Sequence, residues 1–278
     1  MNLGAARSQY HAELFASVLT VSDLGVASNA DNSSKLSRSI AMSIVEQLGT
    51  ARRIAKLAGQ TAGKDFETVC AAFVETTFLH LSHLRGGRFS IRKGGGIAQF
   101  DQYEHLAALE LIARQNREIA TALGSDYLIK PDIVIATHPV DDARINAADL
   151  IVDDDIARLT PFRSANNPRP TLHASISCKW TLRSDRAQNA RSEGLNLVRN
   201  RKGRLPHIAV ITAEPMPSRI ASLALGTGDI DCVYHFALPE LVRAVDQHGN
   251  DDSRESLATM VEGRRLRDVA DLPLDLLL

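Results

Sequence analysis

The sequence contains few cysteines and lacks the patterns in which they bind zinc. Only three occur in 278 residues, Cys70, Cys178 and Cys232, and they lie far apart. They form no C-x-x-C pair, and no histidine stands at the spacing of a structural zinc site. A sparse and odd set of cysteines fits the reducing cytoplasm.

The chain also lacks a long apolar run and an export signal. Its first residues, Met-Asn-Leu-Gly-Ala-Ala-Arg-Ser, contain no basic segment followed by an apolar one. No apolar run approaches the roughly 20 residues that a membrane-spanning helix needs. We therefore expect a soluble cytoplasmic protein with no membrane partner.

A strong net charge is missing as well. The formal net charge is −1, so no overall basicity indicates a nucleic-acid partner, although a basic face can coexist with a neutral total. One local cluster of cations lies between glycine turns and consists of Arg85, Arg88, Arg92 and Lys93. It either contacts a phosphate backbone or forms a solvated edge strand, which is the commoner case.

Alternating strand and helix patterns predict one α/β domain over residues 1–278. We expect a central mixed β-sheet flanked by helices, with the N-terminal third adding a helical layer. The apolar spacing predicts helices near residues 5–20, 36–48, 66–78, 99–123, 219–224, 238–247 and 254–262, and strands near 85–96, 126–137, 172–180, 206–213 and 230–236. Residues 58–67 read as a loop entering the third helix, and 138–170 as a surface excursion.

The stretch Leu172–Trp180 combines a strand with residues suited to phosphate chemistry. Its alternation places Ser177 and Lys179 on one face and Cys178 and Trp180 on the other. A helix pattern rich in arginines and carboxylates follows at once. Taken alone, a lysine in this position is more often an ordinary exposed strand residue.

Two carboxylates accompany this lysine. Asp132 follows Pro131 at the start of an apolar strand, and Glu193 lies inside the helix after Lys179. A hard cation such as Mg²⁺ binds carboxylate oxygens and water, and phosphodiester hydrolysis uses it beside a charge-stabilising amine. These residues together would supply such a site. Glu67 stands next to an apolar helix face, where the simpler interpretation is a solvated glutamate complementing the helix dipole.

The order Pro131-Asp132, Ser177-Cys178-Lys179 and Glu193 resembles the PD-(D/E)xK nucleases. It resembles in particular the rearranged motif of restriction endonucleases that recognise CCGG-containing sites, where a helix glutamate replaces the acidic residue before x-Lys, here Ser177. We expect Ser177 to support its neighbours rather than act as the nucleophile, because the sequence shows no base beside it. The resemblance covers nearly the whole chain, including residues 28–31, 59–61, 123–127, 212–215 and 271–276, and is weakest in 1–20, 85–100, 138–170 and 245–262.

The resemblance implies a restriction-endonuclease-like fold and Mg²⁺-dependent hydrolysis of double-stranded DNA at a GCCGGC-like palindrome. Two ions about 3.5–4 Å apart would serve each active site. It further implies a homotetramer built from two dimers, and a cognate DNA methyltransferase in the cell that forms no stable complex with this chain. The alternatives are a related endonuclease that reads another CCGG-core site, or a catalytically silent DNA-binding protein.

The same resemblance assigns a role to each catalytic residue. Asp132 and Glu193 would hold the metal ions, and the backbone carbonyl of Cys178 would be a further ligand. Lys179 would orient the attacking water and offset the phosphate charge. Glu67 matches a glutamate near the family's active site, which favours a functional role over the solvated one.

Recognition is predicted at the start of the helix that follows Lys179. Arginine reads guanine O6 and N7, and aspartate accepts from cytosine N4, so Arg183, Asp185 and Arg186 suit adjacent G·C pairs. The alternative makes Asp185 a helix N-cap and places the arginines on phosphates. The resemblance favours base readout of the CCGG core.

Three further DNA contacts come from the resemblance alone. Asp31 and Arg219 would read the outer G·C pair, and Gln60 would reach the minor groove.

Overall fold

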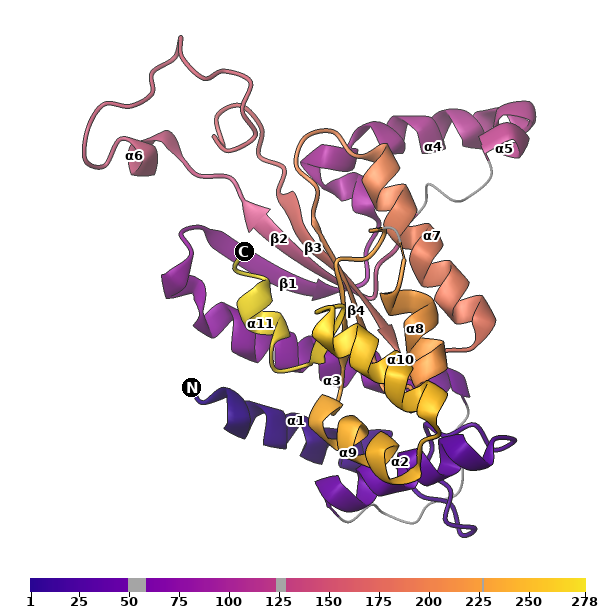
Figure 1. Cartoon of the computed structure of the whole chain (residues 1–278). Helices are drawn as coiled ribbons and strands as arrows, with labels where there is room; N and C mark the ends of the chain where they lie inside the picture. Colours follow the sequence, from indigo (N-terminus) through magenta and orange to yellow (C-terminus); the bar gives the residue numbers. More distant parts are fainter. Residues whose placement is uncertain (50–58, 124–128, 227) are drawn as a thin grey trace.

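A six-stranded mixed β-sheet forms the centre of the fold in the computed structural model, which describes residues 1–49, 59–123, 129–226 and 228–278 (Figure 1). The strands lie in the order β1-β2-β3-β4-β5-β6. β1, β2 and β3 pair antiparallel, whereas β3 to β6 pair parallel. Their bounds are Arg88–Lys93, Ile133–His138, Thr171–Lys179, His207–Thr212, Cys232–His235 and Leu266–Asp268.

The strand patterns of the sequence account for this order. The apolar run of β4 is buried from Ile208 to Thr212, as expected of a central strand in a parallel sheet. The basic strand β1 lies at one edge, where charged side chains discourage pairing with another chain. The three-residue strand β6 at the opposite edge is not predicted, because it is too short for a recognisable alternation.

The helices surround the sheet and mostly match the predicted segments. Their bounds are α1 Leu3–Ser17, α2 Lys35–Leu48, α3 Gly59–His80, α4 His105–Gln115, α5 Arg117–Leu123, α6 Asp142–Ile145, α7 Ser184–Asn200, α8 Pro217–Ala224, α9 Leu238–His248, α10 Asp251–Glu262 and α11 Leu272–Asp275. α1 packs on α3, α3 packs on β1 and β3, and α2 packs on α9. The predicted mixed sheet with an N-terminal helical layer is confirmed.

Three predicted segments differ from the structure. The strand expected at 126–137 begins only at Ile133, since residues 129–132 are not in a strand, and residues 126–128 lie outside the described parts of the chain. The expected loop at 58–67 is already helical from Gly59, because the apolar face of α3 continues backwards through the buried Ala62. The helix expected at 99–123 begins only at His105, after 3-10 turns at Ile97–Gln99 and Asp101–Tyr103, and it consists of two helices separated at Asn116. Asn116 has extended backbone angles, and its side-chain oxygen accepts from the amides of Glu118 and Ile119, so it ends α4 and caps α5. The predicted end at Gly124 lies outside the described residues.

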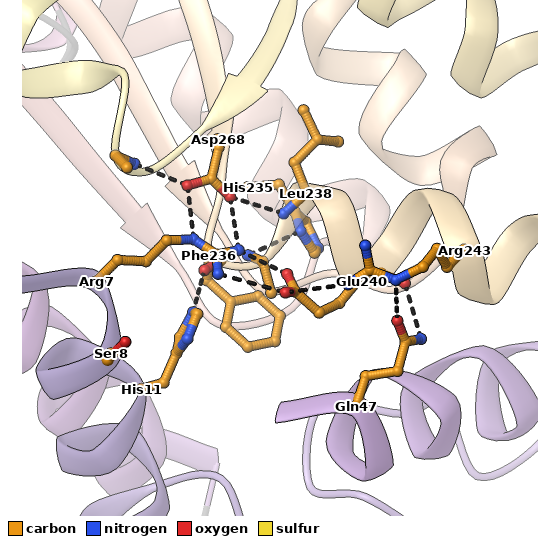
Figure 2. Close-up of polar contacts among 12 residues, drawn as sticks. Arg7, Ser8, His11, Gln47, His235, Phe236, Leu238, Glu240, Arg243 and Asp268 are labelled. Carbon is orange, nitrogen blue, oxygen red and sulfur yellow. Dashed lines mark hydrogen bonds and ion pairs between the residues drawn. The ribbon is translucent and has the colours of Figure 1, made fainter. Parts of the chain in front are cut away.

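A network of charged residues joins the N-terminal helix to the C-terminal part of the chain (Figure 2). Arg7 of α1 binds Glu240 of α9 at 2.6 Å and Asp268 of β6 at 2.9 Å. His11, one turn further along α1, binds the Phe236 carbonyl oxygen through Nε2 at 2.8 Å. These contacts, together with Gln47 of α2 on the Glu240 carbonyl, fix the N-terminal helices against the C-terminal layer.

The segment 139–170 extends away from the sheet between β2 and β3, as predicted for a surface excursion (Figure 1). Arg163 is buried within it and binds Asp142 and the carbonyl oxygens of Asp153 and Ile156. Several large apolar side chains of the segment are exposed: Leu150, Ile151, Ile156, Leu159 and Phe162. Within the described parts of the chain, no helix is both long and apolar enough to cross a membrane.

Candidate active site

The start of β2 meets the end of β3 at the proposed catalytic residues. Ile133 pairs with Ile176, which brings the preceding Asp132 level with the last residues of β3. Asp132 Oδ2 accepts from the Cys178 backbone amide at 2.7 Å and from Lys179 Nζ at 3.0 Å. Antiparallel pairing therefore brings together an aspartate and a lysine that are 47 residues apart in sequence.

Glu193 reaches the same place from α7. Ser177 donates from Oγ to Glu193 Oε2 at 2.9 Å, so the predicted supporting position of Ser177 corresponds to a direct contact with the helix glutamate. The next residue, Gly194, lets α7 approach the chain closely, since a Cβ there would stand 2.3 Å from the Asp229 carbonyl oxygen. The sequence pattern does not identify this glycine, although it permits the close helix packing that places Glu193 beside Ser177.

The charges at this site influence one another strongly. Burial raises the pKa of the Glu193 carboxyl, and the Lys179 ammonium and the Ser177 hydroxyl only partly oppose that shift. Burial by itself lowers the pKa of Lys179, but Asp132 and Glu193 outweigh it, and the net pKa is raised. Lys179 therefore remains a cation between two carboxylates.

Glu67 of α3 lies in the same cleft. Burial and the Asp132 charge raise the pKa of its carboxyl, against the opposing influence of Lys179, Lys93 and Lys64. The cleft is lined by Gly63, Lys64, Glu67, Cys178, Lys179, Trp180, Arg186, Asn189 and Glu193. The structure thus groups Glu67 with Lys179 and Glu193 and places it within electrostatic reach of Asp132.

The oxygen atoms of the site suit a hard cation, although no metal cage is preformed. Among the described residues, no three histidine, cysteine, aspartate or glutamate side chains are grouped closely enough to hold an ion. Mg²⁺ commonly binds through one or two carboxylates plus substrate phosphates and waters. Asp132 and Glu193 can provide the two carboxylates. The Cys178 thiol does not fit this set, because it is buried beside Cys70 and burial raises its pKa. Only backbone oxygen of this residue suits the cation.

The recognition residues predicted after Lys179 lie at the start of α7. Arg183 occupies the N-cap position without a side-chain cap, and Asp185 is in the first turn. The alternative in which Asp185 caps the helix is therefore wrong, because the N-cap is Arg183, two residues before Asp185, and the helix begins at Ser184. Arg183 and Asp185 are exposed, whereas Arg186 is half-buried and donates to Thr181 Oγ1 at 3.1 Å.

Asp31 and Arg219 form an ion pair beside this helix start. Hydrogen bonds from Ser33 and Arg219 hold the pKa of the Asp31 carboxyl well below its ordinary value. Both residues line a cavity of about 880 Å³ that Arg183 also lines. The structure therefore places Arg183, predicted for the inner base pairs, beside the two residues predicted for the outer pair, whereas Arg186 lines the active-site cleft. Gln60 is in the first turn of α3, and its side chain lies outside the described residues.

The cations in and beside the edge strand β1 contact different parts of the chain. Arg85 donates to the Leu277 carbonyl oxygen at 2.8 Å, and Arg92 to Gln99 Oε1 at 2.8 Å. Lys93 lies opposite Ile133 in the sheet, one residue from Asp132, and binds Thr68 Oγ1. Of this cluster, Lys93 thus lies at the end of β1 nearest to Asp132, whereas Arg85 contacts the C-terminal segment.

The sequence of this chain matches a known family over almost its whole length. Residues 10–278 match the family model described as NgoMIV restriction enzyme. Over 276 residues the chain is 51% identical to the type II restriction enzyme NgoMIV of Neisseria gonorrhoeae, an alignment covering 97% of this chain and 96% of that protein. A solved complex of restriction endonuclease PspGI with substrate DNA aligns over 99% of this chain and 92% of its own, with a TM-score of 0.30 and 13% identity. The two sequence matches, rather than this weak structural likeness, show that the chain belongs to the NgoMIV restriction enzyme family.

Proposed function

We propose that this type II restriction enzyme hydrolyses phosphodiester bonds of double-stranded DNA at a GCCGGC-like palindrome with the help of Mg²⁺. The observation that carries the proposal is the contact of Asp132 with Lys179, next to Glu193, at the end of β3. The exposed recognition residues of α7 begin only four residues later, at Arg183. The same strand-turn-helix unit would therefore read bases and hold the scissile phosphate.

Asp132, Glu193 and the Cys178 backbone carbonyl would hold the metal, with two ions for each active site. Bound Mg²⁺ supplies Lewis-acid stabilisation of the phosphate and lowers the pKa of water. Lys179, kept protonated by its two carboxylate neighbours, would orient the attacking water and offset negative charge on the phosphate. Glu67 would complete the acidic side of the cleft.

Sequence recognition would be divided between two groups of residues. Arg183, Asp185 and Arg186 would read the CCGG core in the major groove, where arginine pairs with guanine and aspartate with cytosine. Asp31 and Arg219 would read the outer G·C pair, and their ion pair places a donor and an acceptor together. Gln60 would contribute in the minor groove.

We further propose a cytoplasmic homotetramer composed of two dimers. The excursion exposes several large apolar side chains, among them Leu159 and Phe162, and contact with a second copy of this chain would bury them. The cognate methyltransferase would act on the same DNA site without forming a stable complex. Size-exclusion chromatography with light scattering tests the assembly, and Leu159→Asp should reduce the mass if this surface is the contact.

Plasmid cleavage tests the proposed activity. Plasmids with and without GCCGGC are incubated with the enzyme in Mg²⁺ or in chelator. We expect discrete fragments only from the plasmid that contains GCCGGC and only in Mg²⁺. Fragments at other CCGG-core sites would reassign the specificity, and binding to DNA without any cleavage would identify a catalytically silent DNA-binding protein.

A further inference from the structure

A buried carboxylate lies directly behind the proposed recognition residues. Glu214 follows β4, and its side chain is only 1% exposed. Glu214 Oε2 accepts from the Leu182 backbone amide at 2.7 Å, just before Arg183. Glu214 Oε1 accepts from the Met216 amide at 3.2 Å and lies 3.7 Å from Arg219 Nη1. One carboxylate thus contacts the chain leading into α7 and the arginine of α8.

The two residues before Glu214 extend this set of contacts. Thr212 Oγ1 donates to the Lys179 carbonyl oxygen at 2.8 Å and accepts from the Glu214 amide at 3.1 Å. The Ala213 carbonyl oxygen accepts from Asn29 Nδ2 at 2.8 Å, two residues before Asp31. Residues 212–214 therefore connect the catalytic lysine, the start of the recognition helix and both members of the Asp31–Arg219 pair.

Burying a carboxylate at this point is costly for the fold. Burial raises the pKa of Glu214 to about 7, despite the opposing hydrogen bond from the Leu182 amide and the charge of Arg219. A buried charged group is a weak source of stability, and a well-packed apolar residue often serves the fold as well or better. What an apolar residue cannot supply is a pair of acceptors that fixes a backbone amide and a guanidinium relative to each other.

We propose that Glu214 is a positioning residue for sequence recognition. It holds the first turn of α7 and the Asp31–Arg219 pair in one fixed arrangement and, through Thr212, in register with Lys179. Glu214 itself does not touch DNA in this scheme. The inference rests on the proposed function, because it assigns these two groups to the core and outer base pairs.

The variant Glu214→Gln tests this role in the full-length enzyme. Its amide keeps the size of the side chain, but one acceptor becomes a donor that cannot satisfy both Leu182 and Arg219. The preferred duplex of the wild type is first selected from a randomised library by binding in Ca²⁺. Dissociation constants are then measured for that duplex and for duplexes with the outer or a core base pair replaced, and kcat/KM is measured in Mg²⁺.

We expect Glu214→Gln to reduce discrimination at the outer base pair about tenfold, within the range that one mismatched pair normally costs. Affinity for unrelated DNA should stay unchanged, because that affinity comes from phosphate contacts. Glu240→Gln is the matched control. Glu240 is also a buried, arginine-bound glutamate, but it joins α9 to α1 and contacts no recognition residue among the described contacts. It should lower the melting temperature and leave discrimination unchanged.

An unchanged outer-pair ratio in Glu214→Gln would overturn the positioning role. An equal loss in Glu240→Gln would also overturn it, since general loosening of the fold would then be the cause. If the wild type selects a palindrome other than GCCGGC, the proposed specificity fails, while the ratio measured at that palindrome still decides the role of Glu214. If the wild type selects no sequence at all, both proposals fail.

Discussion

The buried Glu214 carboxylate should make the stability of this protein depend on pH in a defined direction. In the unfolded chain its pKa is 4.5, and in the folded chain it is raised to about 7. The folded state therefore binds this proton more tightly, so the contribution to stability is fully present below pH 4.5 and is lost as the pH rises through 7. A shift of this size corresponds to about 3 kcal/mol, at 1.36 kcal/mol per unit.

Denaturant unfolding of the wild type and of Glu214→Gln between pH 5 and pH 8 measures this contribution. Buried histidines remote from Glu214, such as His173, whose pKa is lowered to about 4, also change the stability of both proteins. Their contribution cancels in the difference between the two unfolding free energies. From pH 5 to pH 8, we expect the wild type to lose about 2–3 kcal/mol of unfolding free energy relative to Glu214→Gln.

Glu240→Gln provides the control for the direction of the effect. Burial alone would raise the pKa of Glu240, but hydrogen bonds from Arg7 and the backbone lower it below its ordinary value. Its titration therefore lies below pH 4.5, and the difference between wild type and this variant should stay flat from pH 5 to pH 8. If the stability difference between wild type and Glu214→Gln does not change with pH, or favours the wild type at high pH, then burial does not raise the pKa of Glu214.

The remaining predictions concern the proposed active site. Lys179→Ala and Asp132→Ala should abolish cleavage and leave DNA binding largely intact in gel-shift assays, whereas equal loss of both would identify them as structural residues. Arg186→Ala should cost about 1–3 kcal/mol of discrimination at its guanine; a loss uniform over all sequences would instead indicate a phosphate contact. Ser177→Ala removes a hydrogen bond of about 1.5–3 kcal/mol to a charged group, and single-turnover cleavage should slow at least tenfold. Ser175→Ala, two residues earlier on the same face of β3, should have little effect, and equal slowing by both variants would argue against the Glu193 contact.

Local sequence patterns were sufficient for most of the elements. The alternation in Leu172–Trp180 predicts β3, and the apolar run after Pro206 predicts the buried β4. Both patterns follow from backbone geometry within a few residues, which does not depend on distant partners. Where the local pattern was ambiguous, as at Asn116 within an otherwise helical stretch, the prediction missed the break between α4 and α5.

The proposed catalytic set follows only in part from local chemistry. Residue types and order suggested that Asp132, Lys179 and Glu193 belong together, and the family resemblance added Glu67. Their actual meeting depends on antiparallel pairing of β2 with β3 and on the close approach of α7 at Gly194. The spacing of these residues in the sequence predicts neither contact. Sheet register is set by the burial of whole strand faces, and the approach of α7 depends on packing against a distant segment at Asp229.

Sequence patterns are enough to identify the family, the succession of strands and helices, and the strand-turn-helix unit from Leu172 to Glu193 on which the proposed chemistry is based. Which polar groups are buried, and what they contact, follows only from the folded chain. Glu214 is an example: it is buried beside the start of α7, and its contacts depend on segments far apart in the chain, from Asn29 to Arg219. Periodicity is a local property of the backbone, whereas burial and pairing belong to the folded chain as a whole.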